Sequence, residues 1–125
     1  MNDITGTWLG TYWQQGTPTR FEVTFVQGGN CLSGQVLDDG DLGEAQVNGE
    51  IIGRSIQFTK QYLTGNNPPI NYTGTLSEDG NLMQGKWAIG KRHSGSWEAH
   101  RSNNDLMASL NNRLAQQVPV GIGKL

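Results

Sequence analysis

The 125 residues suffice for one domain of ordinary size, and nine basic side chains nearly balance eleven acidic ones. A net charge of −2 argues against a nucleic-acid partner, because phosphate binding needs a clustered positive field. The single cysteine, Cys31, excludes an internal disulfide, and no apolar run approaches the roughly 18 residues of a membrane span. The N-terminus lacks the basic and apolar regions of a secretory signal, so we expect a cytoplasmic protein with no membrane partner.

Short segments with alternating apolar and polar side chains fill residues 5 to 101, and turn-forming residues separate them. The predicted strands cover about residues 5–14, 19–27, 31–38, 44–51, 54–62, 70–77, 81–89 and 94–101. All four prolines fall outside these ranges. The nearly even spacing of the predicted strands is typical of a meander, and eight strands can close around one small ligand. The sequence therefore predicts an all-β, eight-stranded antiparallel up-and-down barrel over residues 1–102.

The connections between the predicted strands are of two kinds. The short turns lie at 28–30, 52–53 and 77–80. The longer loops lie at 15–18, 39–43, 63–69 and 90–93. Alternate hairpins of a meander lie at opposite ends of the barrel, so the longer loops should surround one end, where we expect the functional residues.

Glycine is unusually frequent, with 18 residues, about twice the ordinary share. Six of the eight predicted inward faces carry a central glycine, namely Gly10, Gly34, Gly49, Gly74, Gly85 and Gly95. One interpretation is strong coiling of a small barrel with space left for a ligand. The other is that bulky aromatic side chains on neighbouring strands fill the gaps.

The pattern changes after Arg101. Asn104 suits a helix N-cap, and Leu106, Leu110 and Leu114 follow at a spacing of four residues. These features predict a C-terminal α-helix over about 104–117 within the segment 103–125, followed by a flexible tail. The narrow apolar stripe favours packing on the barrel, and it leaves open a homo-oligomer formed through the barrel faces or the helix.

The first and last predicted strands carry a family resemblance. Gly6-Thr7-Trp8 opens the first strand and Arg101 ends the last, which resembles the calycin superfamily of lipocalins, fatty-acid-binding proteins and avidins. The resemblance implies that Trp8 plugs one end of the barrel and that Arg101 lies over its ring. Cation–π attraction would stabilise that pair.

Within the superfamily the chain is most similar to avidins. The segments 4–8 and 32–36 resemble their first and third strands, and Trp87 and Trp97 stand where avidins place two ligand-stacking tryptophans. Asp105 matches a late ligand-contacting aspartate. The resemblance covers most of residues 4–105 and implies a ligand inside the barrel.

The chain also departs from the avidin pattern. Gly10, Tyr12 and Gln14 replace the small polar side chains that bind the ureido oxygen of biotin. Val36 replaces a tyrosine of the third strand, and Lys60 replaces a tryptophan of the fifth. A buried urea carbonyl without donors would lose several kcal/mol, so biotin is not the ligand that we expect.

The inward positions nearest the longer loops combine aromatic rings with a few polar groups, as small-molecule sites do. These candidate ligand-binding residues are Tyr12, Gln14, Phe21, Asp38, Lys60, Tyr62, Tyr72, Trp87 and Trp97. Lys60 has three interpretations: it binds an acidic group of the ligand, it pairs with Asp38, or it reaches solvent. Trp87 and Trp97 either stack on a flat ligand or fill the core.

We therefore expect a small-molecule binding protein that holds a partly aromatic or acidic ligand inside the barrel. One alternative is a barrel enzyme, a cyclase or isomerase acting on a hydrophobic substrate through tyrosine and lysine side chains. Another is a protein-interaction module with a filled core. No catalytic residue, cofactor or metal site is predicted, because no nucleophile–base pair and no metal-ligand spacing is evident. We expect His93 and His100 to be solvated and Cys31 to be packed near the Trp8 end.

Overall fold

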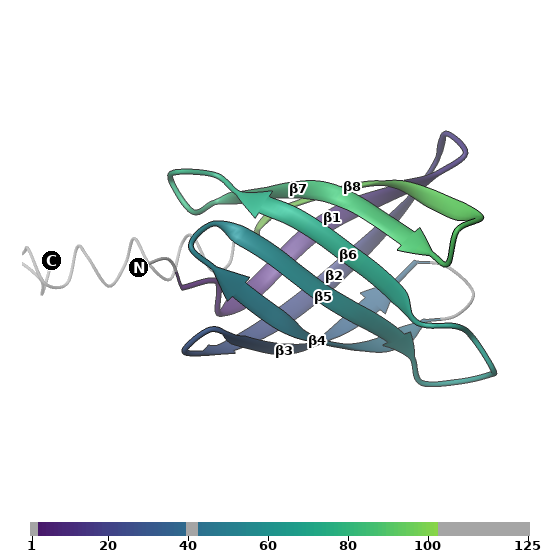
Figure 1. Ribbon diagram of the computed structural model, residues 1–125, viewed down its shortest axis with the longest axis horizontal. Helices are drawn as coiled ribbons and strands as arrows, with labels where there is room; N and C mark the ends of the chain where they lie inside the picture. Colours follow the sequence, from purple (N-terminus) through teal and green to yellow (C-terminus); the bar gives the residue numbers. More distant parts are fainter. Residues whose placement is uncertain (1–2, 40–42, 103–125) are drawn as a thin grey trace, which may run out of the picture.

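The computed structural model describes residues 3–39 and 43–102, which form eight antiparallel strands in one closed barrel (Figure 1). The strands are β1 (Gly6–Gln14), β2 (Thr17–Gly28), β3 (Cys31–Asp38), β4 (Glu44–Ile52), β5 (Ser55–Tyr62), β6 (Ile70–Leu76), β7 (Leu82–Ile89) and β8 (His93–Arg101). Each strand pairs with the next, and β1 pairs with β8 to close the sheet. The predicted fold class is confirmed. The predicted helix at 104–117 and the tail after it lie outside the described residues.

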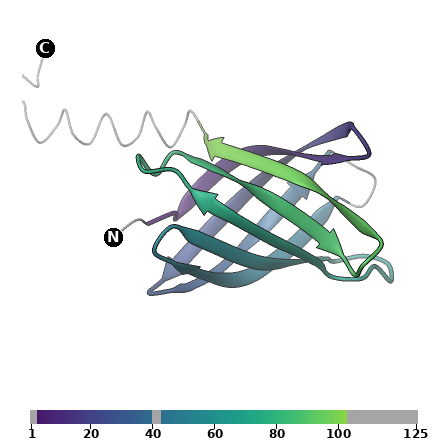
Figure 2. The same ribbon diagram turned by 45° about the horizontal axis from the view of Figure 1, so that its top comes forward.

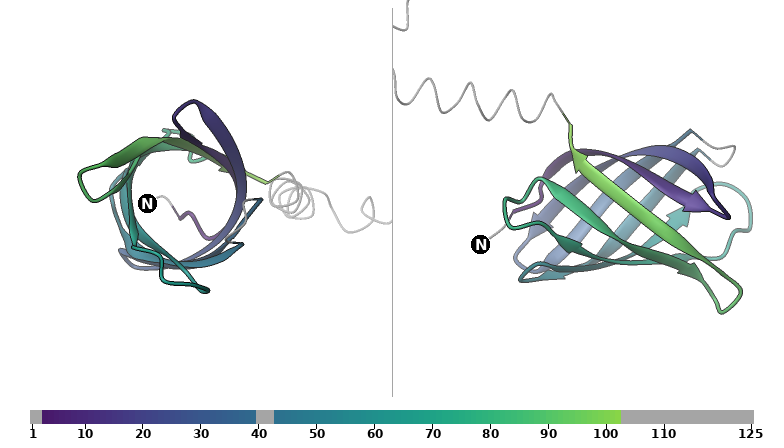
Figure 3. Two further views of the ribbon diagram at one scale, coloured as in Figure 1. Left: turned by 90° about the vertical axis from the view of Figure 1, so that its right-hand side faces the viewer. Right: turned by 90° about the horizontal axis from the view of Figure 1, so that it is seen from above.

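The barrel has two different ends. Viewed along its axis it is a ring of strands, and in side view the tilted β8 runs beside β1 (Figures 2 and 3). The end at the right of Figure 1 holds the β1–β2, β5–β6 and β7–β8 connections, together with the end of β3 and the start of β4, and we call it the Tyr12 end. The other end, the Trp8 end, holds the three remaining turns and the N-terminal segment.

The predicted loop at 15–18 is wrong, because β1 and β2 are joined by the two residues Gln15 and Gly16. Both have positive φ, 50° and 81°, as a tight hairpin turn requires. Glutamine is an unusual residue there, so the sequence carried a weak turn signal. Pro18 consequently lies inside β2, contrary to the expectation. It pairs only with Trp13 of β1, because the pairing of β2 with β3 begins at Phe21, so the missing N–H lies where no neighbouring strand needs it.

The core is sealed more tightly at the Trp8 end. Trp8 and Met83 are completely buried there, and the Trp8 indole N–H donates to the Ile4 carbonyl at 2.9 Å. Toward the Tyr12 end, Phe21, Tyr62 and Ile70 keep between 7% and 9% of their surface exposed. Water therefore approaches the core from the Tyr12 end.

Arg101 lies over Trp8, as the calycin resemblance implies. The guanidinium carbon is 4.7 Å from the centre of the Trp8 ring. The same side chain donates hydrogen bonds to the backbone carbonyls of Asp3, Thr5 and Gly80 at 2.6, 3.4 and 3.0 Å. Arg101 therefore ties the N-terminal segment to the β6–β7 turn across the Trp8 end.

The inward glycines are explained by close packing, and they leave no room for a ligand. A Cβ at Gly85 would lie 1.8 Å from the Thr73 carbonyl oxygen of the neighbouring strand. A Cβ at Gly95 would meet the Trp87 indole nitrogen at 2.6 Å, and one at Gly74 would meet the Trp97 ring at 2.7 Å. Strand coiling and aromatic filling thus act together, and neighbouring backbone and ring atoms occupy the space beside these glycines.

The described residues include no helix long and apolar enough to cross a membrane. Cys31 is exposed, so the expectation that it is packed near the Trp8 end is wrong. As the first residue of β3 it lies beside the Gly29–Asn30 turn, where the side chain points outward in the alternation. His93 and His100 are exposed, as expected.

Candidate functional site

An ion pair lies inside the barrel at the Tyr12 end. The Lys60 ammonium is 2.8 Å from Asp38 Oδ2 and 3.0 Å from Oδ1, and the two side chains are 2% and 1% exposed. Of the three interpretations of Lys60, the structure has the pairing with Asp38. The ammonium is consequently neutralised by the protein itself.

Two tyrosine hydroxyls complete the coordination of the Asp38 carboxylate. Tyr62 donates a short hydrogen bond to Oδ2, and Tyr12 donates to the same oxygen at 3.2 Å. A carboxylate has about four acceptor positions, and four donor contacts reach this one. The acceptor positions of Asp38 are therefore occupied, and this carboxylate is a poor candidate for a general base.

The Lys60 ammonium is also enclosed by aromatic rings. Its nitrogen is 4.7 Å from the centre of the Tyr62 ring and 4.8 Å from that of Tyr12. Tyr72 and Phe21 follow at 5.8 and 6.0 Å. We call the rings of Tyr12, Phe21, Tyr62 and Tyr72 the ammonium cage. Their negative faces attract a cation within about 6 Å, so the cage adds to the attraction of Asp38.

Backbone register brings these groups together from strands that are not neighbours. Asp38 ends β3, and Lys60 and Tyr62 lie near the end of β5, with β4 between them. The β4 residue at this level is Ala45, which is paired with Val36 on one side and with Tyr62 on the other. A small inward side chain there lets the longer side chains of β5 reach the carboxylate over β4.

Burial controls the protonation of the site. Desolvation lowers the pKa of Lys60, and the attraction of Asp38 opposes that shift. Burial also raises the pKa of Tyr62 and Tyr72 far above the ordinary value, and it raises the pKa of Tyr12 in the same direction. The three phenols therefore stay neutral over the physiological range of pH, and those of Tyr12 and Tyr62 donate hydrogen bonds to Asp38.

The remaining predicted residues occupy different surroundings. Trp97 packs on Phe58 and Tyr72, with ring centres 5.6 and 5.7 Å apart, and donates its N–H to the Thr73 carbonyl at 3.0 Å. Trp97 is thus part of the packed core. Phe58 was not among the predicted site residues, although the alternation Ile56, Phe58, Lys60 marked it as inward.

Trp87 contacts the ammonium cage, whereas Gln14 does not point into the barrel. Trp87 meets the Tyr12 ring edge-on at 6.4 Å and donates to the Trp13 carbonyl at 3.0 Å. Gln14 is exposed, so its prediction as an inward residue is wrong. It is the last residue of β1, where the strand has run past the Trp13–Ser96 pair that ends its pairing with β8.

Little space remains at the centre of the barrel. A hollow of about 10 Å³ lies among the inner side chains, room for about one water molecule. Its lining includes Phe21, Val23, Phe25, Val36, Val47, Phe58, Lys60, Tyr72 and Trp97. The described side chains therefore fill the barrel beneath the ammonium cage.

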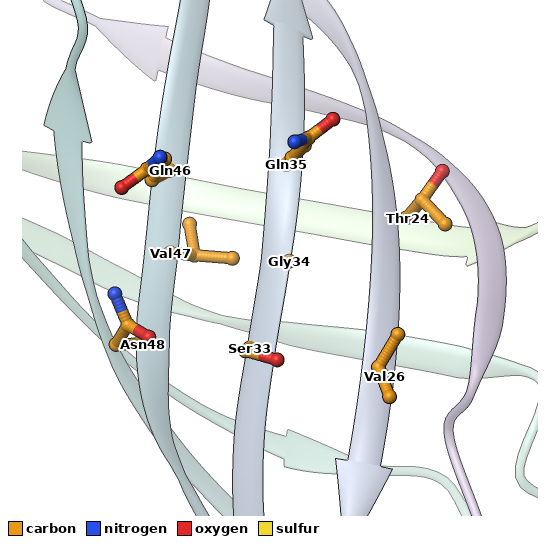
Figure 4. Close-up of a pocket in the computed structure, with 8 residues that line it drawn as sticks. All are labelled: Thr24, Val26, Ser33, Gly34, Gln35, Gln46, Val47 and Asn48. Carbon is orange, nitrogen blue, oxygen red and sulfur yellow. The ribbon is translucent and has the colours of Figure 1, made fainter.

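A larger hollow of about 480 Å³ lies over β2, β3 and β4 (Figure 4). It is lined by Thr24, Val26, Ser33, Gly34, Gln35, Gln46, Val47 and Asn48. None of these side chains carries a charge, and the polar ones belong to the exposed outer face. Within the described part of the chain, no group of three His, Cys, Asp or Glu side chains is arranged to hold a metal ion. The ammonium cage is therefore the more distinctive chemical environment.

Comparison with known proteins agrees with the fold. No protein-family profile matches the chain, and no curated protein sequence is significantly similar to it. Among solved structures, a similar chain is a de novo designed fluorescence-activating β-barrel, with a TM-score of 0.60 and 15% identity. The match covers 78% of this chain and 93% of the designed one. At this identity the similarity shows the fold alone, a closed antiparallel β-barrel.

Proposed function

We propose that the protein binds a small aromatic molecule at the Tyr12 end of the barrel, above the ammonium cage. The observation that carries the proposal is a buried ion pair whose carboxylate accepts hydrogen bonds from two phenols, one of which belongs to the half-buried Tyr12. A buried ion pair contributes little net stability compared with apolar packing, so its presence there favours a role in recognition. The fluorescence-activating function for which the similar designed barrel is named supports ligand binding by a barrel of this fold.

The position of the ligand follows from the packing. With only about 10 Å³ free at the centre, a ligand would rest at the mouth of the barrel instead of beside Trp97. Tyr12 and Phe21, with ring centres 6.1 Å apart, and the nearby Trp87 provide aromatic surface there. These rings favour a flat aromatic ligand, which gains about 0.5–1.5 kcal/mol per aromatic contact beyond burial.

The charges of the β7–β8 connection favour an acidic group on that ligand. Lys91, Arg92 and His93 are exposed at the β7–β8 connection. Lys60 is already paired with Asp38, so the attraction for an anion would come from this exposed loop. We therefore still expect an aromatic, acidic ligand, but its acidic group would contact the exposed β7–β8 loop and not Lys60.

The test uses anilinonaphthalene sulfonate, a flat aromatic acid whose fluorescence rises in apolar surroundings. We expect saturable binding of one dye per chain, quenching of Trp87 fluorescence and no change at the buried Trp8. Tyr12→Ala should weaken binding roughly 2- to 10-fold, which corresponds to one lost aromatic contact. Val26→Ala, which removes an apolar side chain 57% exposed on the outer face, should leave the affinity unchanged. Absence of binding, or a loss caused by Val26→Ala and not by Tyr12→Ala, would refute the proposal.

The packed interior favours a second candidate, an interaction module whose core is full. In that case the protein would bind no dye at the Tyr12 end. Native mass spectrometry of the purified protein separates the two candidates, because it reports a co-purified small molecule and an associated protein in one measurement.

A further inference from the structure

The surroundings of the Lys60 ammonium are those of a receptor for an organic cation. A carboxylate contacts the nitrogen at 2.8 and 3.0 Å, and the faces of four rings lie within 6.0 Å of it. Proteins that recognise ammonium ligands combine aromatic faces with a negative charge in this way. Here the cation belongs to the same chain, and the nitrogen is completely enclosed.

We propose that Asp38 and the ammonium cage form a binding site for a primary alkylammonium ion, and that Lys60 is its built-in occupant. The inference is independent of the function proposed above. In the wild-type protein the occupant is covalently attached, so a free amine does not bind there. Removal of the Lys60 side chain beyond Cβ would leave the shape of n-propylammonium, which has the same three carbons and nitrogen.

The contacts predict a definite selectivity. The two Asp38 oxygens accept N–H donors, so a primary ammonium satisfies both the carboxylate and the rings. Tetramethylammonium has no N–H donor and is bulkier, and it should bind weakly. Propanol has a similar shape and no charge, so it leaves the buried carboxylate without a counter-ion.

The experiment is a chemical rescue of Lys60→Ala. We expect the variant to have a lower Tm than the wild type and to be stabilised saturably by n-propylammonium chloride, with a Kd of the order of 1 mM. At ten times Kd the rise in Tm should be about 5 °C. Sodium chloride, tetramethylammonium chloride and propanol at equal concentration should give a much smaller rise. The matched control Lys86→Ala removes an exposed lysine of β7 and should show no selective response to propylammonium.

A second measurement and a second variant keep the proposal testable if Lys60→Ala is unfolded. Propylammonium should then restore the near-ultraviolet circular dichroism of the barrel, whereas sodium chloride should not. Adding Asp38→Asn to Lys60→Ala removes the carboxylate charge and should abolish the selective rescue. Equal effects of all four additives, the absence of any effect, or a rescue that survives Asp38→Asn would overturn the proposal.

Discussion

Asp38 and Lys60 are separated by 22 residues in the sequence and by one intervening strand, yet the ammonium contacts both carboxylate oxygens. The two side chains are 1% and 2% exposed, so water does not replace either partner when the other is removed. The cost of breaking such a pair is largely the cost of leaving one buried charge alone. Removing one partner should therefore destabilise the protein more than removing both.

Lys60→Met should lower the free energy of unfolding by about 3–5 kcal/mol, because Asp38 is left buried and charged. Lys60→Met combined with Asp38→Leu should recover much of that loss, since the buried charges are then both absent. Chemical denaturation of the wild type, the single variants and the double variant measures the coupling. The exposed Lys86→Met should change stability by less than about 0.5 kcal/mol. Additive losses in the double variant would contradict the ion pair.

Alkaline pH should destabilise the fold through the tyrosines. All three tyrosines of the protein, Tyr12, Tyr62 and Tyr72, lie in the ammonium cage, and burial raises the pKa of each above 10.0. Above pH 10 the unfolded chain loses phenol protons that the folded chain keeps. Folding stability should then fall by up to about 1.4 kcal/mol per pH unit for each tyrosine.

Ionisation of Lys60 has the opposite effect on folding stability, over a lower range of pH. Its pKa is lowered from 10.5, so between the lowered value and 10.5 the unfolded chain binds the additional proton and stability rises with pH. Above 10.5 this contribution is constant, and the three tyrosines dominate. Near-ultraviolet phenolate absorbance should stay flat through pH 10 in the native protein and rise only with unfolding. Titration near pH 10 in the folded state, as in guanidinium chloride, would show that the phenols are accessible.

Gly85 and Gly28 form a matched pair for testing the packing of the strands. A Cβ at Gly85 would lie 1.8 Å from the Thr73 oxygen, and one at Gly28 would meet no atom within 4 Å. Gly85→Ala should therefore cost more than about 3 kcal/mol or prevent folding, whereas Gly28→Ala should be within about 0.5 kcal/mol of the wild type. Thermal denaturation of the two variants gives the comparison, and similar Tm values would show that β6 and β7 can separate.

Arg101→Ala should lower the free energy of unfolding by about 2–3 kcal/mol. The change removes the contact with the Trp8 ring and the hydrogen bonds to the carbonyls of Asp3, Thr5 and Gly80. Hydrogen exchange should accelerate in the N-terminal segment first, because that segment loses its attachment. The exposed loop variant Arg92→Ala serves as the control, and an equal effect of the two would exclude a specific role for Arg101.

The sequence was sufficient to predict the barrel fold and many of the side chains in its interior. Alternation of side chains is a local property, so it identified all eight strands to within about two residues at each end. It also placed Asp38, Lys60 and Tyr62 on the inner face at the same end. The Gln15–Gly16 turn and the position of Pro18 were missed, because they depend on positive φ angles and on where a neighbouring strand begins.

The tertiary structure alone decided what the inward residues do. Whether Lys60 contacts Asp38, a ligand or water depends on the register of three strands and on the small Ala45 between them. The alternation of side chains along one strand carries no information about that register. Whether the glycines leave a cavity depends likewise on how closely neighbouring backbones and tryptophan rings approach. Local periodicity determines which face a side chain occupies. The partner it finds there is determined by contacts between residues far apart in the chain, because only closure of the barrel brings them together.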